Sequence, residues 1–207
     1  TAVPILTVGV VADTHIPDRA PSLPPGLMDG LLAAGAAHIL HAGDVCSQRV
    51  LDELGQVAPV SAVRGNRDFL FQPALPMALE MEFSGVRFGL LHGHGGVRQY
   101  WLDKLGYIMR GYRIERYCRV AARACPDANV WIFGHSHQPE NRWIDGRLVF
   151  NPGAATGFRF GPFDFSPSYG LLRVYPQGRV EGEIIFLDEV EIRGGAWAAC
   201  QTKTKRV

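Results

Sequence analysis

Short apolar runs alternate with helical patterns over the first third of the chain. Residues 5–12 form a run rich in β-branched side chains, which is typical of a strand buried on both faces. Residues 26–35 predict a helix that Gly35 ends, and residues 47–56 predict a helix that Ser47 caps. Strands are predicted at 36–43 and 58–66. This β-α-β-α-β order predicts a parallel sheet with right-handed crossovers.

Hairpins dominate the rest of the chain. Residues 78–93 form two strand-like segments around Ser84-Gly85, and further turns are predicted at Asp145-Gly146 and Gln177-Gly178. Between these hairpins lie a long, mostly helical stretch, predicted from about Val97 to Cys125, and a strand at 129–133. No repeat or linker interrupts the pattern. We therefore expect a single domain over residues 1–207, with a frayed tail from about residue 201.

Composition indicates an ordinary globular protein. The chain is 47% hydrophobic and 20% charged, and its net charge of +1 gives no global attraction for nucleic acid or membranes. We expect a cytoplasmic protein, because no apolar stretch reaches the roughly 18 residues of a membrane span and no leader pattern is present. The four cysteines form no C-x-x-C pair, so we expect reduced thiols.

Candidate chemistry gathers where the predicted strands end. Seven polar residues follow strands and are expected on one rim: Asp13, His15, Asp44, Asn66, His92, His135 and His137. Taken singly, pairs such as Gly43-Asp44 and Gly65-Asn66 are also ordinary turn signals. As a set, two carboxylates, one amide and four imidazoles suit Mn, Fe, Zn or Ni better than Ca. Seven ligands exceed the needs of one ion and favour two ions that share one carboxylate.

Six blocks together resemble one known family. VADTHIPD, LHAGDV, RGNRD, LLHGHG, FGHSHQP and FNPGA occur in the order found in the calcineurin-like metallophosphoesterases, and are most similar to the small single-domain phosphodiesterase branch of bacteria and archaea. The resemblance implies an α/β fold, a four-layer α/β/β/α sandwich of two mixed sheets flanked by helices. It also implies that Asp13, His15 and His137 hold one metal and that Asn66, His92 and His135 hold the other. Asp44 would bridge the two.

The resemblance also implies a function. We expect a phosphoesterase, more specifically a phosphodiesterase, in which two divalent ions, Mn favoured, activate a bridging hydroxide to attack a small-molecule phosphate ester. Two alternatives stay open. One is an interaction scaffold, because a retromer subunit resembles this family, and the other is a nuclease that uses the same metals. The sequence leaves the oligomeric state open, including a homo-oligomer.

The proton donor is the uncertain part of this catalytic prediction. Many members of the wider superfamily carry a histidine directly after the residue equivalent to Asn66, but this chain has Arg67, which cannot donate a proton usefully near pH 7. His94 is the candidate replacement, with Asp68 positioning His94 or Arg67. A chain without an effective acid should prefer esters with good leaving groups, such as aryl phosphates.

Three further features have structural explanations. His38 and His41 are expected to pack within a strand or to support the site. The predicted helix carries several arginines. On a helical wheel, those opposite the apolar face are Arg116, Arg119 and Arg123, so we expect them to be exposed to solvent and not to form a nucleic-acid-binding surface. Arg110 and Arg113 fall elsewhere on the wheel. The segment 158–165 carries four phenylalanines, Phe158, Phe160, Phe163 and Phe165. They predict a hairpin core, with a substrate lid or a dimer surface as alternatives.

Overall fold

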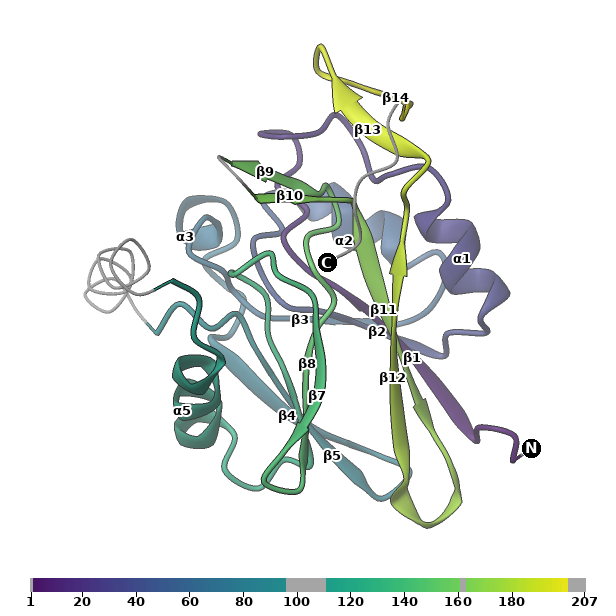
Figure 1. The fold of residues 1–207 in the computed structure, drawn as a ribbon, viewed down its shortest axis with the longest axis vertical. Coiled ribbons are helices and arrows are strands. Elements are labelled where there is room, and N and C mark those ends of the chain that lie inside the picture. The colour runs from purple at the N-terminus through teal and green to yellow at the C-terminus, as the bar shows by residue number, and fades with distance from the viewer. Residues whose placement is uncertain (1, 96–110, 161–162, 201–207) are drawn as a thin grey trace.

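Two five-stranded mixed sheets form the centre of the molecule (Figure 1). The structure is a computed structural model that describes residues 2–95, 111–160 and 163–200. The first sheet has the order β12 (Val180–Phe186), β11 (Ser168–Val174), β1 (Leu6–Val11), β2 (His38–His41) and β3 (Val60–Ala62). The second has the order β4 (Ala78–Phe83), β5 (Val86–Leu91), β6 (Val130–Ile132), β8 (Arg147–Asn151) and β7 (Glu140–Ile144).

Each sheet contains three parallel strands. In the first sheet β1, β2 and β3 pair in parallel, as the alternating pattern predicts, and β3 stands at the edge. In the second sheet β5, β6 and β8 pair in parallel, while β4 and β7 add antiparallel edges. The carboxyl ends of these parallel strands are the positions where loops from distant parts of the chain can meet.

Apolar packing produces four layers. Val10, Phe88, Phe150 and other buried side chains from both sheets form the core between them. Helices α1 (Leu27–Ala33) and α2 (Gln48–Leu54) cover the outer face of the first sheet, and α5 (Ile114–Ala124) covers the outer face of the second. Figure 1 shows α1 and α5 on opposite sides of the molecule. The predicted α/β/β/α sandwich is confirmed.

Local predictions have mixed outcomes. Gly35 follows α1 with a φ of 66°, as predicted, but Ser47 precedes α2 without a side-chain capping bond. Of the mostly helical stretch predicted from about Val97 to Cys125, the described part contains α5 from Ile114 to Ala124, while residues 111–113 are not helical and 96–110 lie outside the described residues. The predicted turns at 84–85, 145–146 and 177–178 join strands, the last through a 3-10 turn at Pro176–Gly178.

Three small elements stand at the same end of the molecule. The segment 158–165 is a hairpin of β9 (Phe158–Phe160) and β10 (Phe163–Phe165), which confirms a hairpin there. Sequence analysis did not predict the helix α3 (Asp68–Phe71) or the hairpin of β13 (Val190–Arg193) and β14 (Ala196–Ala199). Figure 1 shows the two hairpins near each other. Among the described residues, no helix has the length and apolar character required to cross a membrane.

Candidate metal centre

The predicted rim residues all follow parallel strands. Asp13 and His15 come after β1, and Asp44 comes after β2. Asn66 comes after β3. His92 and His94 come after β5, and His135 and His137 come after β6. Both sheets therefore contribute side chains to the cluster, as the strand-end argument predicts.

The first group of side chains in the cluster consists of Asp13, His15 and His137. Each is buried, and their potential ligand atoms lie within 4.8 Å of one another. His137 Nε2 is 3.3 Å from both Asp13 Oδ1 and His15 Nε2. Within the described residues, no donor makes a hydrogen bond of acceptable geometry to the fully buried Asp13 Oδ1. A buried carboxylate oxygen without a donor is costly, and a cation would satisfy it.

The second group of side chains lies around Asp44 and His92. Asp44 Oδ1 is 3.5 Å from His92 Nε2, and Asp44 Oδ2 is 3.7 Å from His15 Nε2, so this carboxylate lies between the two groups. Asn66 Oδ1 is 3.1 Å from His92 Nε2. The His135 ring lies 5.0 Å from the His92 ring, and the His135 backbone N–H donates to Asp13 Oδ2.

The orientation of the His92 ring is informative. Its Nδ1 is 2.7 Å from the carbonyl oxygen of Ala42, which can only accept, so Nδ1 carries a proton. In the neutral ring, Nε2 is then an acceptor that faces two further acceptors, Asn66 Oδ1 and Asp44 Oδ1. A proton or a metal cation between these acceptors makes the arrangement favourable. A backbone carbonyl that fixes the distal nitrogen is also the usual support of a metal-binding histidine. The residues therefore fit a divalent ion.

Electrostatics leave the cluster rich in lone pairs. Burial lowers the pKa of His15 and His135, so both rings are neutral near pH 7. Burial acts to raise the pKa of Asp13, but His137 and the other imidazoles hold it below its ordinary value. For His92, burial opposes protonation, yet the carboxylates of Asp44 and Asp13 raise its pKa. Neutral imidazoles beside an ionised carboxylate are the protonation states that divalent metals require of their ligands.

Glycines allow the loops to approach closely. A Cβ on Gly134 would lie 2.8 Å from Asp13 Oδ2 and 2.9 Å from Ala42 O, and a Cβ on Gly65 would overlap the Asp44 carboxylate. These distances are too short for a side chain. Gly65 and Gly134 are therefore required, because any side chain at either position would prevent the loops from packing against each other.

Asp68 ties two of these loops together. Its fully buried carboxylate accepts hydrogen bonds from the backbone N–H groups of Val45, Cys46 and Gly65 at 2.8 to 3.2 Å. In the described part of the chain it makes no hydrogen bond to His94 or to the Arg67 side chain. The expectation that Asp68 positions one of those two side chains therefore differs from the structure, in which it supports the loops of Asp44 and Asn66.

His94, the candidate acid, and Arg67 lie at the edge of the cluster. The His94 ring is 5.4 Å from that of His92, and burial, with help from His92, lowers the pKa of His94 to about 4. Arg67 is exposed. Its backbone N–H donates to Asp44 Oδ1, and its guanidinium pairs with Asp18 at 3.0 Å.

Arg116 is less exposed to solvent than predicted. Arg119 and Arg123 are exposed as expected, but Arg116 is half-buried. Its Nη2 donates to the carbonyl oxygen of Gly93 at 3.3 Å, and its guanidinium lies over the Tyr117 ring. Helical periodicity gives the side of α5 on which Arg116 lies, but it could not show that the loop of His92 and Gly93 contacts that side. Arg110 lies outside the described residues.

Several residues outside the predicted ligand set support the site. His41, which was expected to pack within its strand or to support the site, is buried and bonds to Thr14 Oγ1 and to the Gly43 N–H, and Thr14 bonds in turn to the Asp44 carbonyl. His38 bonds to Ser61, away from the cluster. Asn151, in the FNPGA block, donates to Gly134 O and Ser136 Oγ and so holds the GHSH loop. That block was the only sequence signal for its role.

Arg19 and Phe158 lie against the outer side of His137. Arg19 Nη1 donates to His137 Nδ1 at 3.3 Å, and the Phe158 ring meets the His137 ring edge to face at 4.7 Å. Of the three alternatives for the phenylalanine segment, its position beside the site agrees with a substrate-side role, at least for Phe158. Phe165 stacks on Phe158 at 6.5 Å.

Comparisons with known proteins agree with this geometry. The family model of the calcineurin-like phosphoesterase superfamily domain matches residues 6–174. A probable metallophosphoesterase of Methanothermobacter thermautotrophicus is 34% identical over 87% of this chain and 92% of its own length.

Solved structures show the same fold. Vacuolar protein sorting 29 (Vps29) of Cryptosporidium parvum is 21% identical and superposes with a TM-score of 0.68 over 97% of this chain and 98% of its own. Vps29 of Entamoeba histolytica in complex with Zn²⁺ is 25% identical, with a TM-score of 0.64 over 87% of this chain and 99% of its own. The chain belongs to the calcineurin-like phosphoesterase superfamily.

Proposed function

We propose that the chain is a metal-dependent phosphoesterase, with phosphodiesters preferred over monoesters, that holds two divalent ions in this cluster. One observation carries the proposal. Potential ligand atoms lie within 4.8 Å of one another in two overlapping groups, Asp13, His15 and His137 in one and Asp13, Asp44 and His92 in the other, and Asn66 Oδ1 lies 3.1 Å from His92 Nε2. Membership of the superfamily supports the reaction class.

The proposed ligand sets follow this geometry. Asp13, His15 and His137 hold one ion, while Asn66, His92 and His135 hold the other. Asp44 has one oxygen toward each group and is the proposed bridge. Ions bound there supply Lewis-acid activation of water and neutralise charge on the phosphoryl oxygens. Mn is our first choice, because nitrogen and oxygen ligands without thiolate suit it.

The chain's own residues bind and orient the substrate. Arg19 and Arg67 place two guanidinium groups beside the cluster, and a planar guanidinium can hold two phosphate oxygens at once. Arg67 supplies charge but no proton, so departure of the leaving group depends on the leaving group's own acidity or on His94. No serine or cysteine nucleophile is required.

Hydrolysis of bis-p-nitrophenyl phosphate with added Mn²⁺ tests the proposal. We expect turnover by the wild type and a loss of about 100-fold or more in kcat/KM for Asp44→Ala, because removing a metal bridge removes the charge stabilisation. Asp127→Ala, at an exposed carboxylate, is the matched control and should retain activity.

Other outcomes separate the alternatives. Metal uptake without turnover of mono- or diesters under Mn²⁺, Fe²⁺, Zn²⁺ or Ni²⁺ would contradict the proposal and favour an interaction scaffold. Faster cleavage of single-stranded DNA or RNA than of small diesters would favour a nuclease instead.

A further inference from the structure

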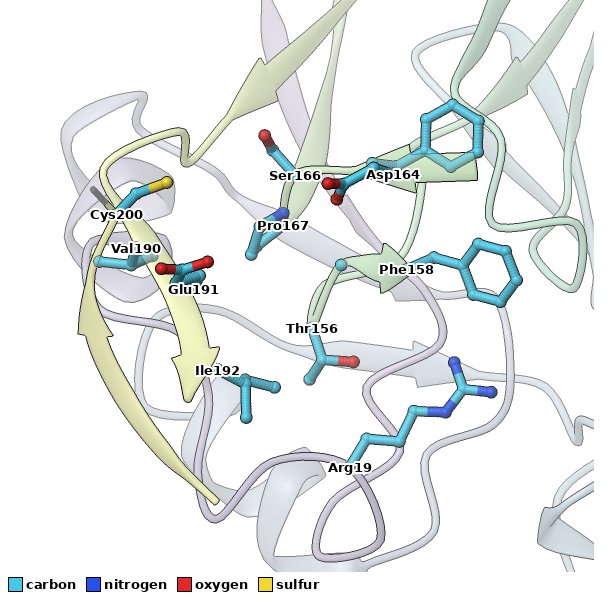
Figure 2. A pocket seen from close by; sticks show the side chains of 12 residues that line it. Arg19, Thr156, Phe158, Asp164, Ser166, Pro167, Val190, Glu191, Ile192 and Cys200 are labelled. Atoms are coloured by element: carbon cyan, nitrogen blue, oxygen red, sulfur yellow. The ribbon is translucent and has the colours of Figure 1, made fainter. Parts of the chain in front are cut away.

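A cavity of about 360 Å³ lies between the hairpins β9–β10 and β13–β14 (Figure 2). Its volume is in the range of small-molecule sites, which is roughly 300 to 1,000 Å³. Arg19 and Thr156 form one wall, and Ile192 of β13 forms part of another. No residue of the proposed metal ligand sets lines it.

The cavity shares its wall with the candidate metal centre. Arg19 lines the cavity and also donates to His137 Nδ1. Thr156 lines it and donates through Oγ1 to the backbone carbonyl of Asp13 at 3.3 Å. Phe158 contacts His137 with its ring. Figure 2 shows the Arg19 guanidinium and the Phe158 ring on the same side of the cavity. A molecule that bridges the two spaces would therefore pass Arg19.

Arg19 places a positive charge beside the candidate metal centre. Its Nη1 lies 3.3 Å from His137 Nδ1, and its guanidinium lies 5.8 Å from the centre of the Phe158 ring. Such a planar cation can bind two oxygens of a phosphate group.

The far side of the cavity carries carboxylates. Figure 2 shows those of Asp164 and Glu191, from the two hairpins, away from the Arg19 guanidinium. Glu191 is paired with Arg193, but each carboxylate oxygen has more than one lone pair and can accept further hydrogen bonds from amines and hydroxyls. The hydroxyl of Ser166 adds a polar group, while Val190 and Ile192 offer apolar surface.

We propose that this cavity receives the second alcohol group of a phosphodiester, and that this group carries an amine or hydroxyls rather than a negative charge. Arg19 lies between the two spaces and binds a phosphate oxygen. This inference rests on the proposed phosphodiesterase function and gives it a substrate class, the diesters of amino alcohols or polyols. In the reaction, water adds to phosphorus, the bond to one alkoxide breaks, and the other alcohol leaves the cavity as its phosphate monoester.

Three diesters with one chromogenic leaving group test the cavity: 2-aminoethyl, n-propyl and 2-carboxyethyl p-nitrophenyl phosphate. We expect kcat/KM to fall in that order, by about tenfold between the first and the last, since one charged contact contributes roughly 1.5 to 3 kcal/mol. Equal values for the three esters, or the reverse order, would overturn the proposal.

Filling the cavity gives a second test. A second pair of substrates, 2-aminoethyl and methyl p-nitrophenyl phosphate, differ in whether their second alcohol group is large enough to fill the cavity. In Ile192→Trp the kcat/KM of the 2-aminoethyl ester relative to that of the methyl ester should fall by about tenfold, because the larger side chain occupies the cavity. Ala196→Trp, on the exposed strand of the same hairpin, is the matched control and should keep the wild-type ratio. An unchanged ratio in Ile192→Trp, with a thermal melt like that of the control, would contradict the proposal.

Binding separates failure of this proposal from failure of the proposed function. If the wild type hydrolyses no ester, the phosphoesterase proposal fails, but the cavity can still be tested by calorimetric titration with 2-aminoethyl methylphosphonate, which lacks the nitrophenyl leaving group. We expect the wild type and Ala196→Trp to bind it and Ile192→Trp to bind about tenfold more weakly. Equal affinity in all three proteins would contradict the cavity assignment.

Discussion

Most of the candidate ligands have a left-handed backbone. The structure records positive φ values of 47° to 65° for five of them: Asp13, His15, Asp44, His135 and His137. Such conformations are uncommon outside glycine and cost of order 1 kcal/mol or more each, so they persist where surrounding structure fixes them. The hydrogen bonds that Asp13 and Asp44 accept from the backbones of His135 and Arg67 are part of that structure.

Replacement of Asp68 tests this support. Asp68→Asn keeps the shape but turns an acceptor oxygen into a donor that faces backbone N–H groups. We expect the free energy of unfolding to fall by about 2 to 4 kcal/mol in urea denaturation, and the affinity for Mn²⁺ to fall with it. Asp127→Asn, at an exposed carboxylate, should change neither. Wild-type stability in Asp68→Asn would show that the three backbone contacts contribute little.

The residue after Asn66 gives a prediction about leaving groups. With Arg67, kcat should decrease steeply as the pKa of the leaving alcohol increases. Arg67→His introduces a proton donor at this position and should raise the rate for alkyl esters relative to aryl esters by about tenfold, at the low end of general-acid effects. Arg67→Gln controls for loss of the guanidinium. A wild-type kcat that does not depend on the pKa of the leaving alcohol would contradict this prediction.

At the scale of elements, α5 is attached to the site through Arg116. This side chain donates to Gly93 O, next to His92, while Arg119 points to solvent. We expect Arg116→Ala to lower the free energy of unfolding by about 1 kcal/mol, and Arg119→Ala to stay within about 0.5 kcal/mol of the wild type. Denaturant melts of both variants measure the difference. Equal effects would mean that the Gly93 contact adds no stability.

The elements that sequence could predict are those with a strong local pattern. The apolar runs of β1 and β5 and the turn at Asp145-Gly146 follow from residue type, and so does the position of polar residues at strand ends. The hairpin β13–β14 was missed because residues such as Glu191 and Arg193 mask its alternation, and α3 because four residues carry no helical period.

At the scale of the whole molecule, the site depends on two sheets meeting. Asp13 and His137 are far apart in sequence, yet their side-chain atoms lie 3.3 Å apart because β1 and β6 end at the same rim. The family resemblance allowed this convergence to be expected. Neither pattern nor resemblance indicated the cavity beside it, since its walls come from two hairpins whose relative placement depends on packing. The same limit applies to the contact between Arg19 and His137.

The number of divalent ions bound per chain tests the central claim most directly. After loading with Mn²⁺ and removal of free metal, elemental analysis of the wild type should give about two ions per chain, and Asp44→Ala should give one or fewer, because the proposed bridge is lost. Asp127→Ala should match the wild type. A wild-type chain that takes up no divalent ion, or an Asp44→Ala variant that still binds two, would contradict a centre built on Asp44.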